Sequence, residues 1–369
     1  MNDKFNIENE DNMEKEKKSK IKKILVNLTI FILLIILTFS LVLKDQDVSQ
    51  IFSVAAKVKK QYILFAVLAM SIYILGEAVN ITRILKELGE KSKFISNIRY
   101  TLIGFFFSAI TPAASGGQPM EIYYMHKDDI SVANSTLALL MQLCSLQIVT
   151  ITVGTISAVI HFEVLKSGLI YLLILGIILN SSALMLLIIA IFSKKLSEGL
   201  IKFAVKLLKF FRIPNVEKKQ EKLEKELESY QTSAKYIKEH KILMLKTVIT
   251  TVVQMIAYYS VPYWIYLAFG LTEYNIFEIL TLQAVLYATV SGIPSPGAVG
   301  VSEGGFLGIF KNVFPETIIS SAMLLTRGAN FYLFIIISAI IVMISTFREK
   351  KIEKKQMQET EVLTEKSEK

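Results

Sequence analysis

Two stretches of sequence decide the fold of this chain: ITPAASGGQPMEIYY at residues 110–124 and GIPSPGAVGVSEGG at residues 292–305. The apolar run that leads into the first stretch has ten residues, enough for about 15 Å of helix, or half of a bilayer core. Proline and glycine then break the helix in both stretches. We predict that each stretch is the tip of a re-entrant hairpin, broken by Pro112 in the first and by Pro294 and Pro296 in the second.

The rest of the chain has the composition of a membrane protein. Of its 369 residues, 53% are hydrophobic, and the mean hydropathy is +0.49, more apolar than a soluble domain usually is. Several apolar runs reach the roughly 20 residues that span a bilayer. We predict an all-α integral membrane protein with about six full spans besides the two hairpins. The predicted spans are 24–43, 61–82, 132–160, 168–192, 243–269 and 317–346, and the predicted hairpins are 100–125 and 276–313.

Positive charge between the spans predicts their orientation, because basic loops stay in the cytoplasm. The tail 1–23 is rich in lysine, and the linker 193–242 holds thirteen basic residues, whereas the loop 270–275 holds none. We therefore predict a plasma-membrane protein with both termini, including the tail 347–369, in the cytoplasm. The first part of the linker, residues 195–212, has the pattern of a helix lying in the membrane plane, against an anionic membrane surface. The second part, residues 217–229, is predicted to be a charged, solvated helix.

The two broken regions repeat one another. Pro112 lies nine residues before Glu121, and Pro294 lies nine residues before Glu303. The second proline and the second glutamate each come 182 positions after the first. The orientation above makes the first hairpin open to the cytoplasm and the second to the outside. This is the pattern of an inverted-topology repeat, with a membrane half at 24–192 and another at 243–346. The alternative is two ordinary Gly/Pro loops between helices.

Charged residues beside the breaks are the candidate site. Glu121 and Glu303 lie at membrane depth, where a charge costs about 2.5–3.5 kcal/mol unless it is paired or hydrated. They line a lipid headgroup site, act in proton coupling, or lie at water-exposed hairpin ends. Arg327, deep in the last span, binds a lipid phosphate or pairs with Glu303, functionally or as a structural ion pair. Glu77 is placed near the cytoplasmic end of its span, within reach of water.

Small and amide residues complete the candidate set. Gly116, Gly117, Gly297 and Gly300 give the backbone freedom to turn, or bare their amides to an anionic group. Four glutamines within apolar segments predict hydrogen bonds between helices; they are Gln142, Gln147, Gln254 and Gln283. Cys144 is the sole cysteine and the three histidines are far apart, so we expect no disulfide, no metal site and no cofactor.

The two broken stretches also resemble the signatures of a known family. Residues 110–124 and 292–305 look like the first and second motifs of the flippase-like membrane domain of lysylphosphatidylglycerol synthases, with Ala298 at a position where the family usually has glycine. The resemblance covers about residues 20–348. The best-known full-length members lysinylate phosphatidylglycerol and move the product to the outer leaflet, which protects against cationic peptides. In those members a soluble C-terminal domain performs the transfer.

The resemblance implies a flippase-like protein that translocates or handles an anionic or aminoacylated phospholipid, or a polyprenyl-linked lipid. One alternative is a phosphatidylglycerol lysyltransferase that works with a separate soluble aminoacyltransferase. A second alternative is a non-transporting membrane scaffold. About 23 residues follow the last predicted span, too few for a transferase domain, so we expect no lysyl transfer by this chain alone. No motif predicts direct binding to nucleic acid.

The predicted orientation can be tested by cysteine labelling in a Cys144→Ser background. Cysteines introduced at Thr272 and Val164 should react with an impermeant thiol reagent added to intact cells, because both positions are predicted to be outside. A cysteine at Lys225 should react after the cells are opened and not before. Labelling of Lys225→Cys in intact cells would overturn the orientation.

Overall fold

The computed structural model describes residues 48–111, 114–162, 169–193, 216–293 and 295–347, together with residues 29, 195, 198, 199, 202 and 206. This part of the chain contains helices and no strands. The predicted first span 24–43, both tails and most of the predicted in-plane helix lie outside the described residues. The elements are α2 (Val48–Ala56), α3 (Lys60–Glu87), α4 (Phe94–Ile110), α5 (Gly117–Lys127), α6 (Val132–Ile160), α8 (Leu169–Phe192), α10 (Val216–Glu239), α11 (Lys241–Ala268), α12 (Ile276–Val290), the 3₁₀ turn η2 (Pro296–Ala298), α13 (Val301–Ile309), α14 (Ile319–Arg327) and the π-helical turn η3 (Gly328–Tyr332).

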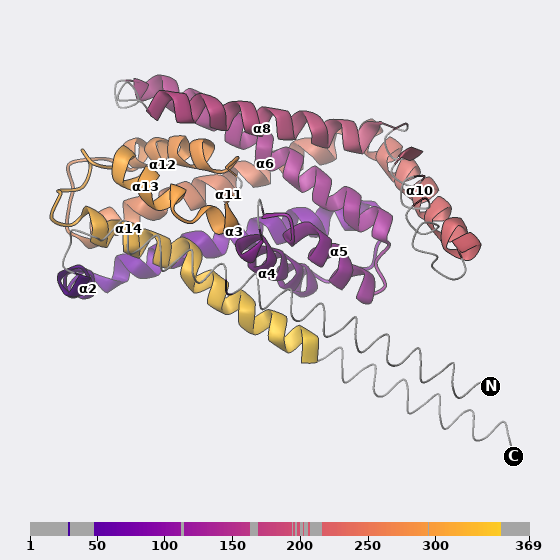
Figure 1. The fold of residues 1–369 in the computed structure, drawn as a ribbon, viewed down its shortest axis with the longest axis horizontal. Coiled ribbons are helices and arrows are strands. Elements are labelled where there is room, and N and C mark those ends of the chain that lie inside the picture. The colour runs from indigo at the N-terminus through magenta and orange to yellow at the C-terminus, as the bar shows by residue number, and fades with distance from the viewer. Residues whose placement is uncertain are drawn as a thin grey trace, which may run out of the picture.

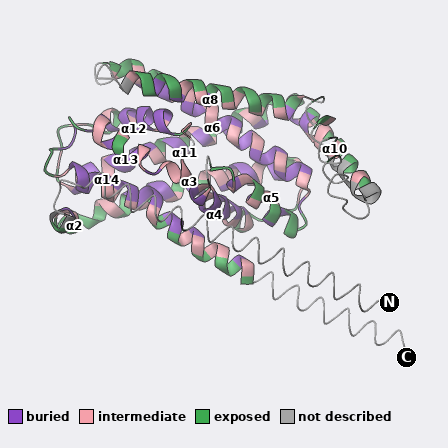
Figure 2. Cartoon of the chain, in the orientation of Figure 1, coloured by how far each residue is buried: buried purple, intermediate pink, exposed green. Residues whose placement is uncertain are grey.

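Five helices are long and apolar enough to cross a membrane: α3, α6, α8, α11, and the helix that runs from α14 through η3 to Phe347. They correspond to five of the six predicted spans. α8 lies along one outer side of the molecule, and the helix from α14 to Phe347 lies on the opposite side (Figure 1). Figure 2 shows that most of α8 is exposed, and its exposed side chains are large and apolar, such as Tyr171 and Leu186. An apolar outer surface of this kind is suited to lipid, and the chain is a multi-pass membrane protein.

The order of elements repeats after the linker. A long helix, a shorter helix, a break, a short helix and a second long helix follow one another in α3, α4, α5 and α6. The same order recurs in α11, α12, α13 and the helix from α14 to Phe347. α4 begins at Phe94 and α12 at Ile276, exactly the spacing that separates Glu121 from Glu303. The repeat predicted from two motifs therefore extends to whole helices.

The first helices of the two halves pack together and run antiparallel. Phe65 contacts Trp264, Tyr73 contacts Tyr258, and Arg83 donates a hydrogen bond to the backbone oxygen of Lys246. Residue numbers thus fall along α11 as they rise along α3. In between, Gly76 lets the side chain of Gln254 approach closely, since a β-carbon on Gly76 would lie 2.9 Å from that of Gln254. α3 and α11 are therefore packed closely along their length and run in opposite directions.

Small residues bring α6 and α8 against α12. A β-carbon on Gly154 of α6 would lie 2.5 Å from the β-carbon of Ala288. A β-carbon on Gly176 of α8 would lie 2.3 Å from the backbone oxygen of Ala288. Helices in membranes associate through small residues that let backbones approach. α12, the helix that leads into the second break, is therefore clamped on two sides.

The charged helix of the linker continues past the part predicted to be solvated, residues 217–229. Glu221 and Lys225 of α10 are exposed, as a solvated helix requires. Its C-terminal half is docked, however: Tyr230 donates a hydrogen bond to the backbone oxygen of Ala190, and Ser233 to Asn134. Ile237 is buried. Apolar residues at the C-terminal end of α10 thus cover the ends of α6 and α8.

The contact between α8 and α12 predicts a specific sensitivity at Gly176. Gly176→Val should lower the free energy of unfolding by about 1–3 kcal/mol, because the added atoms meet rigid backbone. Thermal unfolding of the purified protein in detergent measures the loss. Gly304→Ala is the control, since its β-carbon would meet no atom within 4 Å. Equal melting temperatures for Gly176→Val and the wild type would contradict the packing.

Candidate functional site

A cavity of about 460 Å³ lies between the two broken regions. Ser108 and Ser115 line it from the first break, and Ser291 and Gly297 from the second. Arg327, which follows the second break on α14, also lines it. Helices α3, α6, α8 and α11 contribute the remaining walls. The two motifs that are 182 residues apart in sequence therefore meet around one partly open cavity, which many polar side chains line.

The second break turns on glycines and one alanine with left-handed backbone. Gly297 has φ +58°, Ala298 φ +51° and Gly300 φ +87°. Gly297 also has no room for a side chain, because a β-carbon would lie 2.2 Å from the ring of Phe331. At Ala298 the left-handed conformation costs roughly 1–2 kcal/mol. A glycine at this position would adopt the same conformation without that cost.

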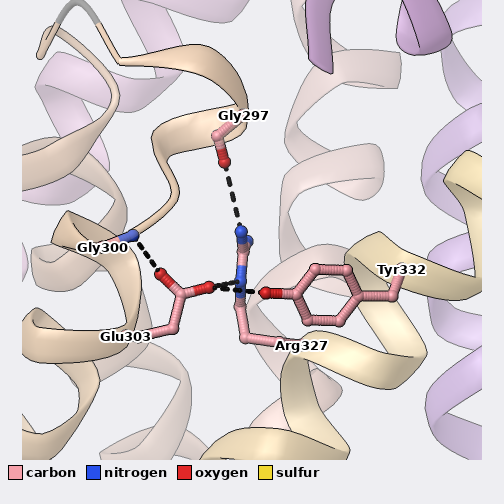
Figure 3. A network of polar contacts seen from close by, with 5 residues as sticks. All are labelled: Gly297, Gly300, Glu303, Arg327 and Tyr332. Carbon is pink, nitrogen blue, oxygen red and sulfur yellow. Dashed lines mark hydrogen bonds and ion pairs between the residues drawn. The ribbon is translucent and has the colours of Figure 1, made fainter. Parts of the chain in front are cut away.

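Glu303 ties the second break to the last long helix (Figure 3). One carboxylate oxygen, Oε2, accepts a hydrogen bond from the backbone amide of Gly300 at 2.7 Å. The other, Oε1, accepts from Nε of Arg327 at 2.8 Å and from the hydroxyl of Tyr332 at 3.1 Å. The side chain of Glu303 is fully buried. A buried carboxylate is stable only when it is paired in this way.

Arg327 is held from three sides. Besides the bond to Glu303, its Nη2 donates to the backbone oxygen of Gly297 at 3.1 Å, and its guanidinium lies 4.0 Å from the ring centroid of Phe331. Nη1 has no hydrogen bond to the described residues, and Arg327 lines the cavity. The pairing of Glu303 with Arg327, one of the two predicted arrangements, is present. It leaves one guanidinium nitrogen for an anion in the cavity.

The first break brings a different carboxylate to the cavity. Glu121 on α5 is 2% exposed, and its Oε2 has no hydrogen-bond partner among the described residues. Its Oε1 lies where a side chain on Gly104 of α4 would lie: a β-carbon there would be 2.0 Å away. Gly104 thus provides the space for this carboxylate. Gly104 could not be singled out from the sequence, because nothing in the sequence says which residue of α4 faces α5.

The sequence matches the family described as the lysylphosphatidylglycerol synthase TM region over residues 24–338. This chain belongs to that family. It is also similar to a protein named "UPF0104 membrane protein" from Archaeoglobus fulgidus. The two are 25% identical over 276 residues, which is 71% of this chain and 80% of that protein. The resemblance inferred from the two broken motifs is confirmed.

Glu77 lies in a different place from the one predicted for it. From the sequence it was expected near the cytoplasmic end of its span, within reach of water. Instead it lies ten residues before the end of α3 and lines the same cavity as Glu121. The spacing carried one indication, since Tyr73 lies one helical turn before Glu77 and Asn80 nearly one turn after it, which makes a polar stripe on α3. Tyr73 and Glu77 line the cavity, and Asn80 donates hydrogen bonds to Gln142 and Thr251 beside it.

Two of the four glutamines, Gln142 and Gln254, form the predicted hydrogen bonds between helices, whereas Oε1 of Gln283 has no partner among the described residues. Asn80 donates hydrogen bonds to Gln142 at 2.8 Å and to Thr251 at 3.0 Å, and Gln142 donates to Gln254 at 3.4 Å. These bonds join α3, α6 and α11 beside the cavity. Gln147 also lines the cavity, and its Oε1 has no partner among the described residues.

The four glycines predicted at the breaks are placed by packing. The amide of Gly116 donates to Thr111, and that of Gly300 to Glu303, so both are occupied within the protein. Gly117 has no room for a side chain, since a β-carbon would lie 2.0 Å from Oγ of Ser108. Pro296 begins η2. Pro112 and Pro294 lie outside the described residues. Among the described residues no group of three His, Cys, Asp or Glu is arranged to hold a metal.

The buried ion pair predicts a loss of stability when only one of its two partners is removed. Arg327→Met should lower the free energy of unfolding by about 3–5 kcal/mol, because it leaves Glu303 charged and buried. The double variant Glu303→Gln with Arg327→Met should recover part of that loss, since no unpaired charge remains. Thermal unfolding in detergent compares them. A double variant less stable than Arg327→Met would contradict the pairing.

Proposed function

We propose that this protein is a flippase-like lipid handler, and that the headgroup of an anionic or aminoacylated phospholipid occupies the central cavity. The observation that carries the proposal is a polar cavity at the meeting point of two broken helices, inside a protein with an apolar outer surface. Its volume, about 460 Å³, is in the range of sites that enclose a small molecule. A polar headgroup needs such a path because the surrounding lipid offers it no hydrogen bonds.

In this proposal the two broken regions are re-entrant hairpins that open to opposite faces of the plasma membrane. The antiparallel packing of α3 and α11 supports the inversion, because each helix begins one of the two similar halves. With the predicted span 24–43 the chain crosses the membrane six times, and both termini are cytoplasmic. The cavity then lies between the hairpins, where transporters with inverted repeats bind their substrates.

Arg327 is the proposed contact to the lipid phosphate. Its Nε is held by Glu303 and its Nη2 by the backbone oxygen of Gly297. These two bonds fix the plane of the guanidinium and leave Nη1 of this cavity-lining residue for the phosphate. A guanidinium fixed in this way binds a phosphate oxygen with little further loss of side-chain entropy. Glu303 is accordingly a positioning residue.

A lipid-movement assay tests the proposal. The purified protein in liposomes should move acyl-chain-labelled phosphatidylglycerol or lysylphosphatidylglycerol between leaflets faster than labelled phosphatidylcholine, and protein-free vesicles should move neither. The rate is the loss of fluorescence when an impermeant quencher is added outside. Movement of none of the three lipids would overturn the proposal.

Arg327→Lys tests the proposed phosphate contact. The variant should lose most of the lipid movement, on the order of tenfold or more, because an ammonium cannot replace the planar fork that Glu303 holds. Lys311→Arg, on an exposed loop, is the matched control and should leave the rate unchanged. Full activity of Arg327→Lys would remove Arg327 from the site.

A further inference from the structure

The two halves of the protein treat their repeated glutamate differently. In the second half, the long helix that follows the break supplies Arg327, which pairs with Glu303. In the first half, the long helix that follows the break is α6, and between Val132 and Ile160 it contains no lysine, arginine or histidine. The repeat therefore keeps the carboxylate of Glu121 without the cation that neutralises its counterpart.

Glu121 is also buried as deeply as Glu303, at 2% exposure. Glu303 has three hydrogen-bond donors, whereas Oε2 of Glu121 has none among the described residues. Neither Glu121 nor Glu77 forms an ion pair with a described residue. A buried, ionised carboxylate without a partner is costly. Glu77 is half-buried and lines the same cavity as Glu121, so its negative charge adds to that cost.

The cavity offers no fixed charge to balance this pair. Its titratable side chains in the described part of the chain come from α3, α5, α11, α12 and α14; they are Tyr73, Glu77, Glu121, Tyr258, Tyr287 and Arg327. Arg327 is the sole cation in that set, and it is already bound to Glu303 and Gly297. The wall from α4 contributes Gly104 and Thr101, which carry no charge. The positive charge that Glu77 and Glu121 need must therefore be exchangeable.

We propose that Glu121 and Glu77 form a carboxyl pair that binds one exchangeable proton, and that this proton is coupled to the passage of the lipid headgroup. This inference rests on the proposed function, and it names the proton as the ion that drives the movement of the lipid. The proton is taken from water on one side of the membrane, forms an O–H bond with one carboxylate oxygen, and is released to water on the other side. No other bond is made or broken.

The coupling follows from charge. When the pair is deprotonated, its negative charge repels an anionic headgroup in the same cavity. When it holds a proton, that repulsion falls and the phosphate reaches Arg327 across the cavity. Proton binding and anion binding thus favour each other, and by linkage the effect is equal in both directions. The proton and the anionic headgroup move in the same direction.

Infrared difference spectroscopy tests the proton site without reference to transport. The purified wild-type protein at neutral pH should show the C=O stretch of a protonated carboxylic acid. Glu121→Gln or Glu77→Gln should remove that band, and Glu316→Gln, on an exposed loop, should retain it. A wild-type spectrum without the band, or a band that survives both site variants, would overturn the inference.

A pH gradient tests the coupling in liposomes that contain trace labelled phosphatidylglycerol. With one proton per lipid, one unit of gradient should shift the leaflet ratio of the label about tenfold. With the Glu121→Gln variant, the labelled lipid should reach the same leaflet ratio at every pH gradient. Gly104→Ala keeps both carboxylates but displaces that of Glu121, so it should weaken the gradient response while Gly304→Ala does not.

The outcomes separate the two proposals. Lipid movement that ignores the gradient in the wild type overturns the coupling and leaves the proposed function standing. No lipid movement in any condition overturns the proposed function and the coupling with it, while the infrared band still decides whether Glu121 and Glu77 hold a proton.

Discussion

Irregular backbone inside an apolar environment is the constraint on which this structure depends. A broken helix exposes amides and carbonyls that lipid cannot satisfy, so the break must be buried in protein or must line a polar space. At the second break the protein does both. Glu303 accepts the amide of Gly300, and Arg327 donates to the carbonyl of Gly297. One ion pair therefore caps both sides of the break, and the same requirement places a guanidinium beside the cavity.

Much of the fold could be predicted because each span must satisfy the same constraint alone. Long apolar runs gave five of the described helices to within a few residues, and the Pro/Gly stretches gave the breaks. The Glu303–Arg327 contact was accessible for a related reason: an arginine at membrane depth needs a partner, and few carboxylates lie near it in sequence. These inferences need only the free-energy cost of placing a single group in lipid, and this cost can be assigned from the residue types in the sequence.

The rest depends on which faces of the helices meet, and the cost of single groups does not specify this. Glu77 was placed near water because its span ends nearby, yet the rotation of α3 turns it into the cavity that Glu121 also lines. The role of Gly104 depends on Glu121, whose carboxylate occupies the space where a side chain on Gly104 would lie. The docking of α10 through Tyr230 and Ser233 was likewise hidden, since their partners lie on other helices far along the chain. Pairwise contacts between distant segments are what hydropathy and motif spacing leave open.

The antiparallel pairing of α3 with α11 brings the two breaks to one cavity, and with them two versions of one motif. The scaffold is repeated, but the charge is not: Glu303 is neutralised within its own half, and Glu121 is not. A site made of two fixed ion pairs would hold its charge constant in every state. A site with one fixed pair and one open carboxylate has a field that changes when a small ion binds or leaves. The asymmetry of charge on a symmetric frame is thus what would allow a neutral scaffold to respond to its surroundings.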